Sequence, residues 1–418
     1  MTTGGVTTGG TVPATKAYRA GTDRVVEPRE TLARVRPLFP LMGITRVADV
    51  TGLDHIGIPV VMVVRPNARS LSVAQGKGVD FDAAAASGVM ESIEAWHAER
   101  LTLPLRLGSV ADLRWSLPLV DTAALPRCAE VPFSDDAPLL WCEGRELLGA
   151  GSCFVPYELV HTNYTLPRPT GAGMFLATSN GLASGNVLAE ATSHALCEVI
   201  ERDCTTLWHL RGEAGQAGTR IDLDTVHEPL CRGVLDAFER AAVAVGVWDT
   251  TSDVGVPSFY SVILDREDHA MNRLHAAAGM GCHPKRSIAL LRALTEAAQS
   301  RLTVIAGSRD DVVSEDYRRA RAPHLLARER ALLVGGRGER AFTEVPDLDH
   351  DTIDEDIGEL LSRLRQIGVE QVVAVDLTNP DIGVAVVRVV VPGLEAASEI
   401  DGYQPGRRAR AAAEGRVG

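Results

Sequence analysis

The chain lacks the patterns that would cross-link, secrete or anchor a protein. Its seven cysteines are odd in number and show no CxxC spacing, so we do not expect a structural zinc knuckle. No apolar run reaches the length of a membrane span, because the longest, such as 384–391, are only strand-sized. The N-terminus has no basic n-region or apolar h-region, so no secretory signal is expected. These absences predict a cytoplasmic protein with reduced cysteines.

Positive charge is also scarce. The 418 residues include 42 basic and 55 acidic side chains, which give a formal net charge of -13. Nucleic acid and anionic membranes both require a basic footprint, so we expect neither as the main partner. Hydrophobic residues make up 45% and charged residues 23%, which is ordinary for a globular protein. The length allows two or three domain-sized units, or one large wound domain.

The familiar signatures of nucleotide binding are missing as well. The chain has no Walker A motif, no protein-kinase glycine loop with its partner motifs, and no GxGxxG after a strand. If ATP binds here, it binds in a different architecture.

The ends of the chain differ in composition from its middle. The Thr/Gly-rich start predicts a disordered tail over residues 1–16. A C-terminal tail is expected over 396–418, and its basic, Ala/Gly-rich part, 406–418, is expected to fray. Between them, residues 17–395 predict one α/β domain. Its segment 101–170, with short strands and several prolines, is interpreted as an inserted side sheet.

Hydrophobic spacing within this domain separates helices from strands. The expected helices cover 28–38, 81–100, a stretch ending near 210, 227–245, 286–306, 314–333 and 354–367. The expected strands include 45–50, 59–65, 247–250, 258–265, 371–376 and 383–391. Three stretches rich in small or polar residues, at 65–78, 179–186 and 276–283, are interpreted as loops.

Each of these three loops leads into a helix with a similar pair of side chains. The pairs are Glu91/Glu94, Glu198/Glu201 and Glu296/Gln299. The first member of each pair lies thirteen residues after Gly78, Gly185 or His283. Residues three apart project from one helix face. The recurrence predicts a repeated α/β unit that brings three helices to a common centre.

A centre that gathers four glutamates needs cations. A close pair of unit charges costs ~4 kcal/mol at an effective dielectric of about 20. Mg²⁺ suits carboxylate oxygens and shares its shell with phosphates, so a nucleotide would complete the site. Nearby cations could bind the phosphates, namely Arg202, Arg292, Arg301 and Lys77. For a single ExxE helix, a solvated acidic face is the simpler interpretation.

Taken together, these motifs resemble those of the YcaO family. The first reads Ser87-xxx-Glu91-xx-Glu94, and the third reads Arg292-xxx-Glu296-xx-Gln299. The second reads Ser179-Asn-Gly followed by Ser184-Gly-Asn186-xxx-Glu190-x7-Glu198-xx-Glu201-Arg202. The resemblance covers nearly the whole chain, from about residue 19 to 394.

The resemblance implies a YcaO-type ATP-binding fold in which three motif helices converge on a nucleotide and two Mg²⁺ ions. The implied Mg²⁺ ligands are Glu91, Glu94, Glu198 and Glu201. The implied nucleotide contacts are Lys77, Ser87, Ser184, Asn186, Glu190, Arg202, Arg292, Glu296 and Arg309. Lys77 and Arg309 are chosen from loop position and charge, and a surface role stays open for both. Three of the contacts are also catalytic candidates, with either glutamate as a proton acceptor: Glu190, Arg202 and Glu296.

The resemblance also implies a reaction. YcaO enzymes phosphorylate the carbonyl oxygen of a peptide backbone amide, and a nucleophile then displaces the phosphate. Sulfide gives a thioamide, whereas a Cys, Ser or Thr side chain gives an azoline. Azoline-forming members typically end in PxPxP, which 396–418 lacks. The loops at 65–78 and 308–311 resemble the TfuA-associated, thioamide-forming subgroup. We therefore expect a ribosomally made precursor peptide and a TfuA-like protein as partners, and by analogy a homodimer.

Other interpretations stay open at this point. The chain could be an azoline-forming cyclodehydratase, a non-catalytic nucleotide-binding scaffold, or a large α/β protein whose ExxE helices lie on the surface. A scaffold has no need to crowd four acids. His194, four residues before Glu198, is interpreted as a packed or hydrogen-bonded side chain rather than a catalytic base.

Overall fold

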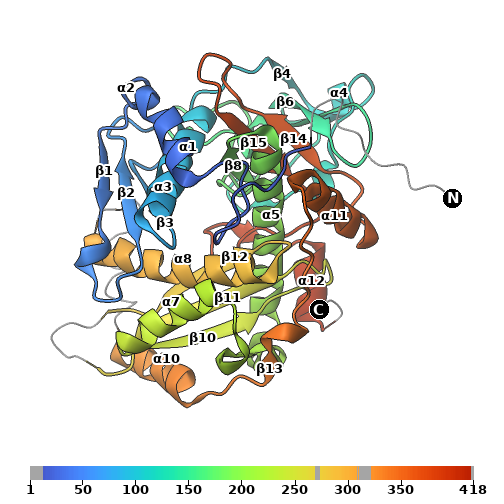
Figure 1. Ribbon diagram of the computed structural model, residues 1–418. Coiled ribbons are helices and arrows are strands. Elements are labelled where there is room, and N and C mark those ends of the chain that lie inside the picture. The colour runs from blue at the N-terminus through green and yellow to red at the C-terminus, as the bar shows by residue number, and fades with distance from the viewer. Residues whose placement is uncertain (1–12, 269–273, 308, 310–321, 416–418) are drawn as a thin grey trace.

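The computed structural model describes residues 13–268, 274–307, 309 and 322–415. Two three-stranded antiparallel sheets and one six-stranded sheet carry the main helices (Figure 1). The strands and helices alternate as an α/β fold, as the sequence predicts. Among the described residues, no helix is long and apolar enough to cross a membrane.

The first and third motif helices belong to units built in the same way. The first unit is β1 (Arg46–Asp49), β2 (Val60–Val64), β3 (Val73–Lys77) and α3 (Phe81–Ala98). The third is β10 (Val243–Asp249), β11 (Ser258–Asp265), β12 (Ala277–Cys282) and α8 (Arg286–Ala306). An equivalent backbone hydrogen bond closes the last two strands of each unit, from the residue after the third strand to the residue before the second. It runs from Gly78 N–H to Pro59 O (3.3 Å) and from His283 N–H to Pro257 O (3.2 Å). Two of the three predicted repeats are therefore confirmed.

The second motif helix is positioned differently. It is α5 (Leu188–Leu210), and it follows β8 (Leu182–Gly185) at the edge of the six-stranded sheet. The other strands of that sheet are β4 (Leu105–Gly108), β6 (Leu139–Glu146), β7 (Ser152–Pro156), β14 (Val373–Asp376) and β15 (Ala385–Val390). β8 pairs with β15, with Ser184 opposite Val386. The expected side sheet over residues 101–170 is not separate, because β4, β6 and β7 form part of this sheet.

Each of the three expected loops before the motif helices contains a strand, namely β3, β8 or β12. Their glycines are needed for close packing. A Cβ on Gly76 would lie 2.0 Å from the Ala84 carbonyl oxygen, and one on Gly281 would lie 2.1 Å from that of Ala289. A Cβ on Gly185 would lie 2.7 Å from the Ala191 nitrogen. Each helix backbone thus packs directly on its strand, so the small residues reflect contact rather than flexibility.

The remaining elements surround this framework. The helices are α1 (Pro28–Val35), α2 (Phe39–Met42), α4 (Val110–Leu113), α6 (Gly212–Gln216), α7 (Pro229–Arg240), α10 (Pro323–Gly335), α11 (Ile353–Gln366) and α12 (Arg407–Ala413). The short strands are β5 (Arg127–Cys128), β9 (Ile221–Asp222), β13 (Arg340–Ala341) and β16 (Tyr403–Gln404). The helix expected over 227–245 ends early, because the chain turns at Ala242 (φ 54°) and enters β10. Residues 314–321 of the helix expected over 314–333 lie outside the described residues.

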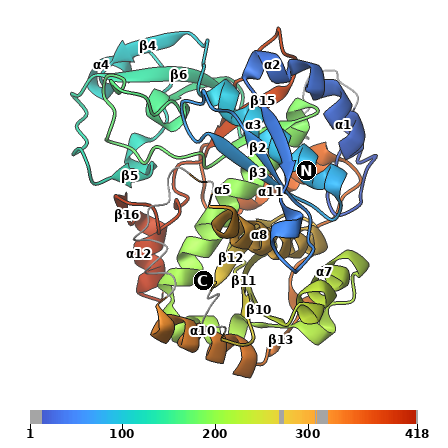
Figure 2. The same cartoon turned by 90° about the vertical axis from the view of Figure 1, so that its left-hand side faces the viewer.

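Both expected tails contribute to the folded domain. Lys16 is buried, and residues 14 and 15 bond to α11 and the residue before it, so order begins before residue 17. At the other end, α12 packs beside α5 (Figure 2). The guanidinium of Arg408 binds Asp203 (2.9 Å) and Asp253 (2.5 Å). Residues 1–12 and 416–418 lie outside the described residues.

Apolar faces of the three motif helices form the core. In α3, Val89 and Ile93 are fully buried in a cluster with Trp141 of β6. In α8, Leu290 and Leu294 are fully buried with the inner faces of β10 and β11. In α5, the buried residues include Leu196 and Ile200, which cluster with α11 and β15. The opposite faces of these helices point toward one another.

The glycine contact on β12 gives a test of stability. Gly281→Ala should lower the free energy of unfolding by about 3 kcal/mol, since the two atoms nearest to the new Cβ belong to the backbone of α8. Gly358→Ala, at an open helical position in α11, should raise it by about 0.5–1 kcal/mol. Urea unfolding of both variants would measure this, and equal effects would contradict the packing argument.

A buried ion pair holds the loop after β2 against the end of α3. Arg65 donates two hydrogen bonds to Glu99, of 2.8 and 2.7 Å, and Ser70 donates two more. Burial alone would raise the pKa of Glu99, but Arg65 and Ser70 outweigh it and lower this pKa to about 2. The pair therefore stabilises the fold above the ordinary carboxyl pKa, and this contribution is lost as the pH falls toward 2.

Glu99→Gln should therefore destabilise the protein by about 3 kcal/mol at neutral pH. The difference from the wild type should shrink as the pH is lowered from about 5 toward 3, where the wild-type carboxylate loses its advantage. Denaturant unfolding across this range is the measurement. The matched control is Glu130→Gln, which breaks an exposed pair with Arg168 and should cost less than about 1 kcal/mol. A pH-independent difference for Glu99→Gln would refute the assignment.

Candidate functional site

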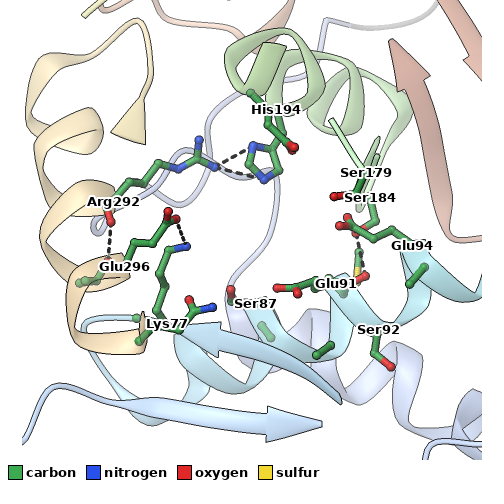
Figure 3. Close-up of a pocket in the computed structure, with 18 of the residues that line it drawn as sticks. Lys77, Ser87, Glu91, Ser92, Glu94, Ser179, Ser184, His194, Arg292 and Glu296 are labelled. Carbon is green, nitrogen blue, oxygen red and sulfur yellow. Dashed lines mark hydrogen bonds and ion pairs between the residues drawn. The ribbon is translucent and has the colours of Figure 1, made fainter. Parts of the chain in front are cut away.

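A cavity of about 760 Å³ opens where α3, α5 and α8 converge. Figure 3 shows side chains from all three helices directed into this space. The thirteen residues that the family resemblance implies as Mg²⁺ ligands or nucleotide contacts all line it: Lys77, Ser87, Glu91, Glu94, Ser184, Asn186, Glu190, Glu198, Glu201, Arg202, Arg292, Glu296 and Arg309. The fold thus brings together residues that are far apart in the chain.

The first helix supplies two carboxylates to this cavity. Glu91 is open to the cavity space and Glu94 is half-buried (Figure 3). The Ser184 hydroxyl donates to Glu94 Oε2 (3.1 Å), which ties α3 to β8. Enclosure by protein raises the pKa of Glu91 to about 7, against the pull of Lys77. Burial, and then Glu91 and Glu198, hold the pKa of Glu94 well above its usual range.

The second helix supplies the opposing pair. Glu198 is half-buried and Glu201 is buried. Burial raises the pKa of Glu198, although Arg202 and Arg388 oppose the shift. Burial also raises the pKa of Glu201 to about 7, and Arg202, 3.7 Å away, opposes it. These two carboxyls therefore resemble the first pair in having raised pKa values.

Four carboxyls with raised pKa values around one space disfavour one another's ionisation. Neutral glutamic acids could relieve the repulsion, but divalent cations would relieve it while leaving all four ionised. Oxygen donors of this kind suit Mg²⁺, which keeps part of its shell for water and phosphate. The donor set therefore fits Mg²⁺ together with a phosphate ligand.

Positive charge enters the cavity from β3 and α8. Lys77 Nζ lies 2.6 Å from Glu296 Oε2, and the Met280 N–H donates to the other carboxylate oxygen (3.2 Å). Burial would raise the pKa of Glu296, but Lys77 and Arg202 outweigh it and lower this pKa. An acid held in this ionised form is a weak proton acceptor. Binding and orientation suit Glu296 better than acid–base work.

Arg292 and His194 meet on the wall between α8 and α5 (Figure 3). The Arg292 guanidinium donates to His194 Nδ1 (2.9 Å) and to the Cys282 carbonyl oxygen (3.2 Å). Burial and then Arg292 hold the pKa of His194 well below its usual range. His194 is therefore neutral and hydrogen-bonded, as the sequence predicts.

Glu190 and Asn186 are already engaged by the chain itself. One oxygen of Glu190 accepts from the Val25 N–H (2.6 Å), and the other accepts from the Asn186 backbone (2.7 Å) and side chain (3.0 Å). The Asn186 Oδ1 accepts from Thr31 (2.9 Å) and Arg34 (2.9 Å). These bonds favour a positioning role for Glu190 over the proton-acceptor role considered from the sequence.

Sequence reasoning missed Arg24 and Thr31 and misplaced Arg301. Arg24 and Thr31 line the cavity from a segment that precedes all three motifs. Arg24 ends the turn at 19–24, and neither this turn nor Thr31 belongs to a motif that would identify a binding residue. Arg301, proposed as a phosphate contact, is instead fully buried between Asp54 (2.8 Å) and Asp265 (2.9 Å). A helix position five residues beyond Glu296 turns away from the cavity face.

Comparison of the sequence with known families gives a match that covers most of the chain. Residues 75–395 match the family model described as "YcaO cyclodehydratase, ATP- and Mg²⁺-binding". A Rhizobium leguminosarum bv. trifolii protein named "Uncharacterized protein in tfuA 3'region" is 39% identical over 393 residues, covering 93% of this chain and 92% of that protein. A Methanothermobacter thermautotrophicus protein is 36% identical over 397 residues, covering 93% and 98%.

Solved structures agree at the level of the fold. The structure of YcaO from Methanopyrus kandleri bound with AMPPCP and Mg²⁺ matches with a TM-score of 0.72 at 23% identity, covering 91% of this chain and 95% of that one. A heterocyclase in complex with substrate and cofactor matches with a TM-score of 0.77 at 22% identity. The match covers 96% of this chain and 55% of the heterocyclase.

The carboxylate centre gives a direct binding test. Glu198→Gln should weaken Mg²⁺-dependent binding of AMP-PCP by at least about tenfold, because it removes one charge from the cation site. Isothermal titration calorimetry at fixed Mg²⁺ would measure this, with the thermal midpoint as a check on folding. Glu213→Gln, whose side chain is 82% exposed, is the control and should bind as the wild type. Unchanged binding by folded Glu198→Gln would rule out the proposed ligand set.

Proposed function

This chain belongs to the YcaO family of ATP- and Mg²⁺-dependent peptide-modifying enzymes, and we propose that it converts a peptide backbone amide into a thioamide. The observation that carries the catalytic part of this proposal is the convergence of Glu91, Glu94, Glu198 and Glu201 on one cavity. Four carboxyls enclosed with raised pKa values cost stability, and a scaffold would gain nothing from them.

The proposed reaction replaces one oxygen with sulfur. The amide oxygen attacks the γ-phosphorus of ATP, and ADP leaves with the electrons of the broken P–O bond. Hydrosulfide then adds to the activated carbon and loses its proton. The C–O bond breaks, and the former amide oxygen departs as part of inorganic phosphate, which leaves a C=S bond. The sum is amide, ATP and hydrosulfide giving thioamide, ADP and phosphate.

The chain's own residues divide this work. We propose that the four glutamates hold Mg²⁺, which supplies charge neutralisation for phosphoryl transfer. Lys77, Arg292 and Arg202 face the same space and would attract phosphate oxygens. Ser184 fixes Glu94 through its hydrogen bond, which keeps one acid oriented before a cation arrives.

The remaining lining of the cavity suits a peptide. Neutral hydroxyl groups of Ser72, Thr162, Tyr164 and Ser179 share the cavity with the charged residues. The Thr162 hydroxyl is buried and has no hydrogen-bond partner in the described structure. Hydroxyls both donate and accept, as backbone amides require, whereas phosphates need cations. We infer that the substrate amide is held among these groups.

The choice of sulfide rests on relatives rather than on geometry. A relative with 39% identity takes its name from the region 3' of tfuA. Together with the resemblance of the sequence to the TfuA-associated subgroup, this name supports a TfuA-like protein as partner and a ribosomally made precursor peptide as substrate. The azoline reaction on Cys, Ser or Thr is the alternative that the experiment must separate.

Reconstitution distinguishes the products by mass. The protein, ATP, Mg²⁺, sulfide, the TfuA-like protein and the precursor peptide encoded nearby should give a peptide heavier by about 16 Da, the O-to-S exchange. Omitting sulfide should abolish this product. Mass spectrometry with fragmentation would locate the modified amide. A loss of about 18 Da at a Cys, Ser or Thr residue would establish the azoline reaction instead.

A further inference from the structure

A hairpin at the start of the described chain forms one wall of the cavity. The backbones of Tyr18 and Arg24 exchange two hydrogen bonds, of 2.8 and 2.9 Å. The turn between them, residues 20–22, lines the cavity together with Arg24 itself. Gly21 adopts a φ of +77°, and a Cβ there would lie 2.9 Å from Leu291 of α8. The hairpin therefore fits closely against α8.

Lys16 fastens the base of this hairpin to α11 and to the loop before α11. Its side chain is 0% exposed, and Nζ lies 2.8 Å from Asp356 Oδ2, 2.9 Å from Asp23 Oδ2 and 3.3 Å from Asp349 Oδ1. Burial alone would lower the pKa of Lys16, but Asp356 and Asp23 outweigh it and raise this pKa. The buried ammonium is thus a fixed cation held by three carboxylates.

The surroundings of Lys16 have the geometry of a metal site. Asp23, His283 and Asp356 each offer one ligand atom, and these atoms lie within 4.8 Å of one another. The Lys16 ammonium already binds two of these three residues, so a covalently attached cation takes the place that a metal ion would need. Unlike a metal ion, this cation belongs to the segment that it anchors.

The anchor is directly connected to the nucleotide cavity. Asp23 precedes Arg24, whose Nη1 donates to the Asp23 carbonyl oxygen (2.9 Å). The next residue, Val25, donates its N–H to Glu190 (2.6 Å). Residues of both clusters line one small cavity of about 10 Å³, with Asp23 and Asp356 from the anchor and Arg24, Glu190 and Arg292 from the nucleotide cavity.

Arg24 itself needs an anion. It lies near the like charge of Arg292, with Glu190 and Asp23 as the nearby acids. Two guanidinium groups in a partly closed cavity repel each other, and a phosphate group between them would remove this cost. Arg24 therefore has a reason to bind the nucleotide, provided that the hairpin holds it in place.

We propose that Lys16 is a positioning residue for the nucleotide site, and that its anchorage to Asp23, Asp349 and Asp356 holds Arg24 where the phosphates bind. Lys16 itself does not touch the nucleotide. The proposal rests on the nucleotide site and not on the choice of sulfide, since binding of a non-hydrolysable analogue tests it.

The experiment is a double-mutant cycle on Mg²⁺–AMP-PCP affinity. Lys16→Met and Arg24→Met should each weaken binding about 10- to 100-fold. Because both changes remove the same contact, Lys16→Met should add less than about twofold in the Arg24→Met background. Adenosine, which has no phosphates, should bind all variants alike. A general loss of structure would instead weaken adenosine as well.

Two further variants keep the result interpretable. Lys285→Met removes the other lysine that binds Asp349 (2.8 Å) and should leave AMP-PCP affinity within about twofold of the wild type. Lys16→Met leaves two buried carboxylates uncompensated, which lowers stability. If it does not fold, Lys16→Met/Asp356→Asn removes one charge of each sign and takes its place in the cycle.

Three results would overturn the proposal. The first is wild-type AMP-PCP affinity in folded Lys16→Met or in the charge-balanced double variant. The second is an equal loss from Lys16→Met in the presence and absence of Arg24, which would show that the two residues act independently. The third is unchanged affinity in Arg24→Met.

Discussion

The convergence of four carboxyls on one cavity is the constraint on which the rest of this structure depends. Glu91 and Glu94 come from α3, and Glu198 and Glu201 come from α5, so two helices must approach with their acidic faces opposed. Burial is the main reason that the pKa values of all four carboxyls are raised, and neighbouring like charges add to it. The fold bears the cost of burying them because the opposite faces of the same helices are buried in apolar clusters. Stability comes from one side of each helix and the acidic site from the other.

Close packing between strands and helices sets the positions of these acids. Gly76, Gly185 and Gly281 allow a helix backbone to lie directly on its strand, where any side chain would intervene. A helix fixed in this way has little freedom to rotate, and a rotation would move its carboxylates out of the cavity. The first and third units reach this arrangement through three-stranded sheets, whereas α5 is held by the edge of the six-stranded sheet. Sheets of different kinds thus bring the three helices to the same cavity.

Buried ion pairs fasten both ends of the described chain to the framework that carries the site. Lys16 anchors the hairpin that carries Arg24, and Arg408 of α12 binds Asp203, two residues beyond Glu201. Both are buried ion pairs, which tolerate little displacement because a separated partner would be left as an uncompensated charge. The composition of the two chain ends, rich in Thr, Gly, Ala and Arg, is also that of disordered tails. The local sequence could therefore not distinguish an ordered end from a disordered one. Ion pairs with residues far along the chain, such as Asp356 and Asp203, order both ends.

The sequence by itself determined the main helices, most of the strands and the composition of the cavity lining, because helix periodicity fixes which residues share a face. The three ExxE or ExxQ pairs could be found without coordinates for this reason. Tertiary structure alone decided that the stretches expected as loops contain β3, β8 and β12, that 101–170 joins the main sheet, and that Glu190 is occupied by hydrogen bonds from Val25 and Asn186. It also turned Arg301 toward Asp54 and brought Arg24 into the site. Several of these outcomes depend on contacts between residues far apart in the chain, such as Arg301 with Asp54 and Glu190 with Val25, which no local pattern records.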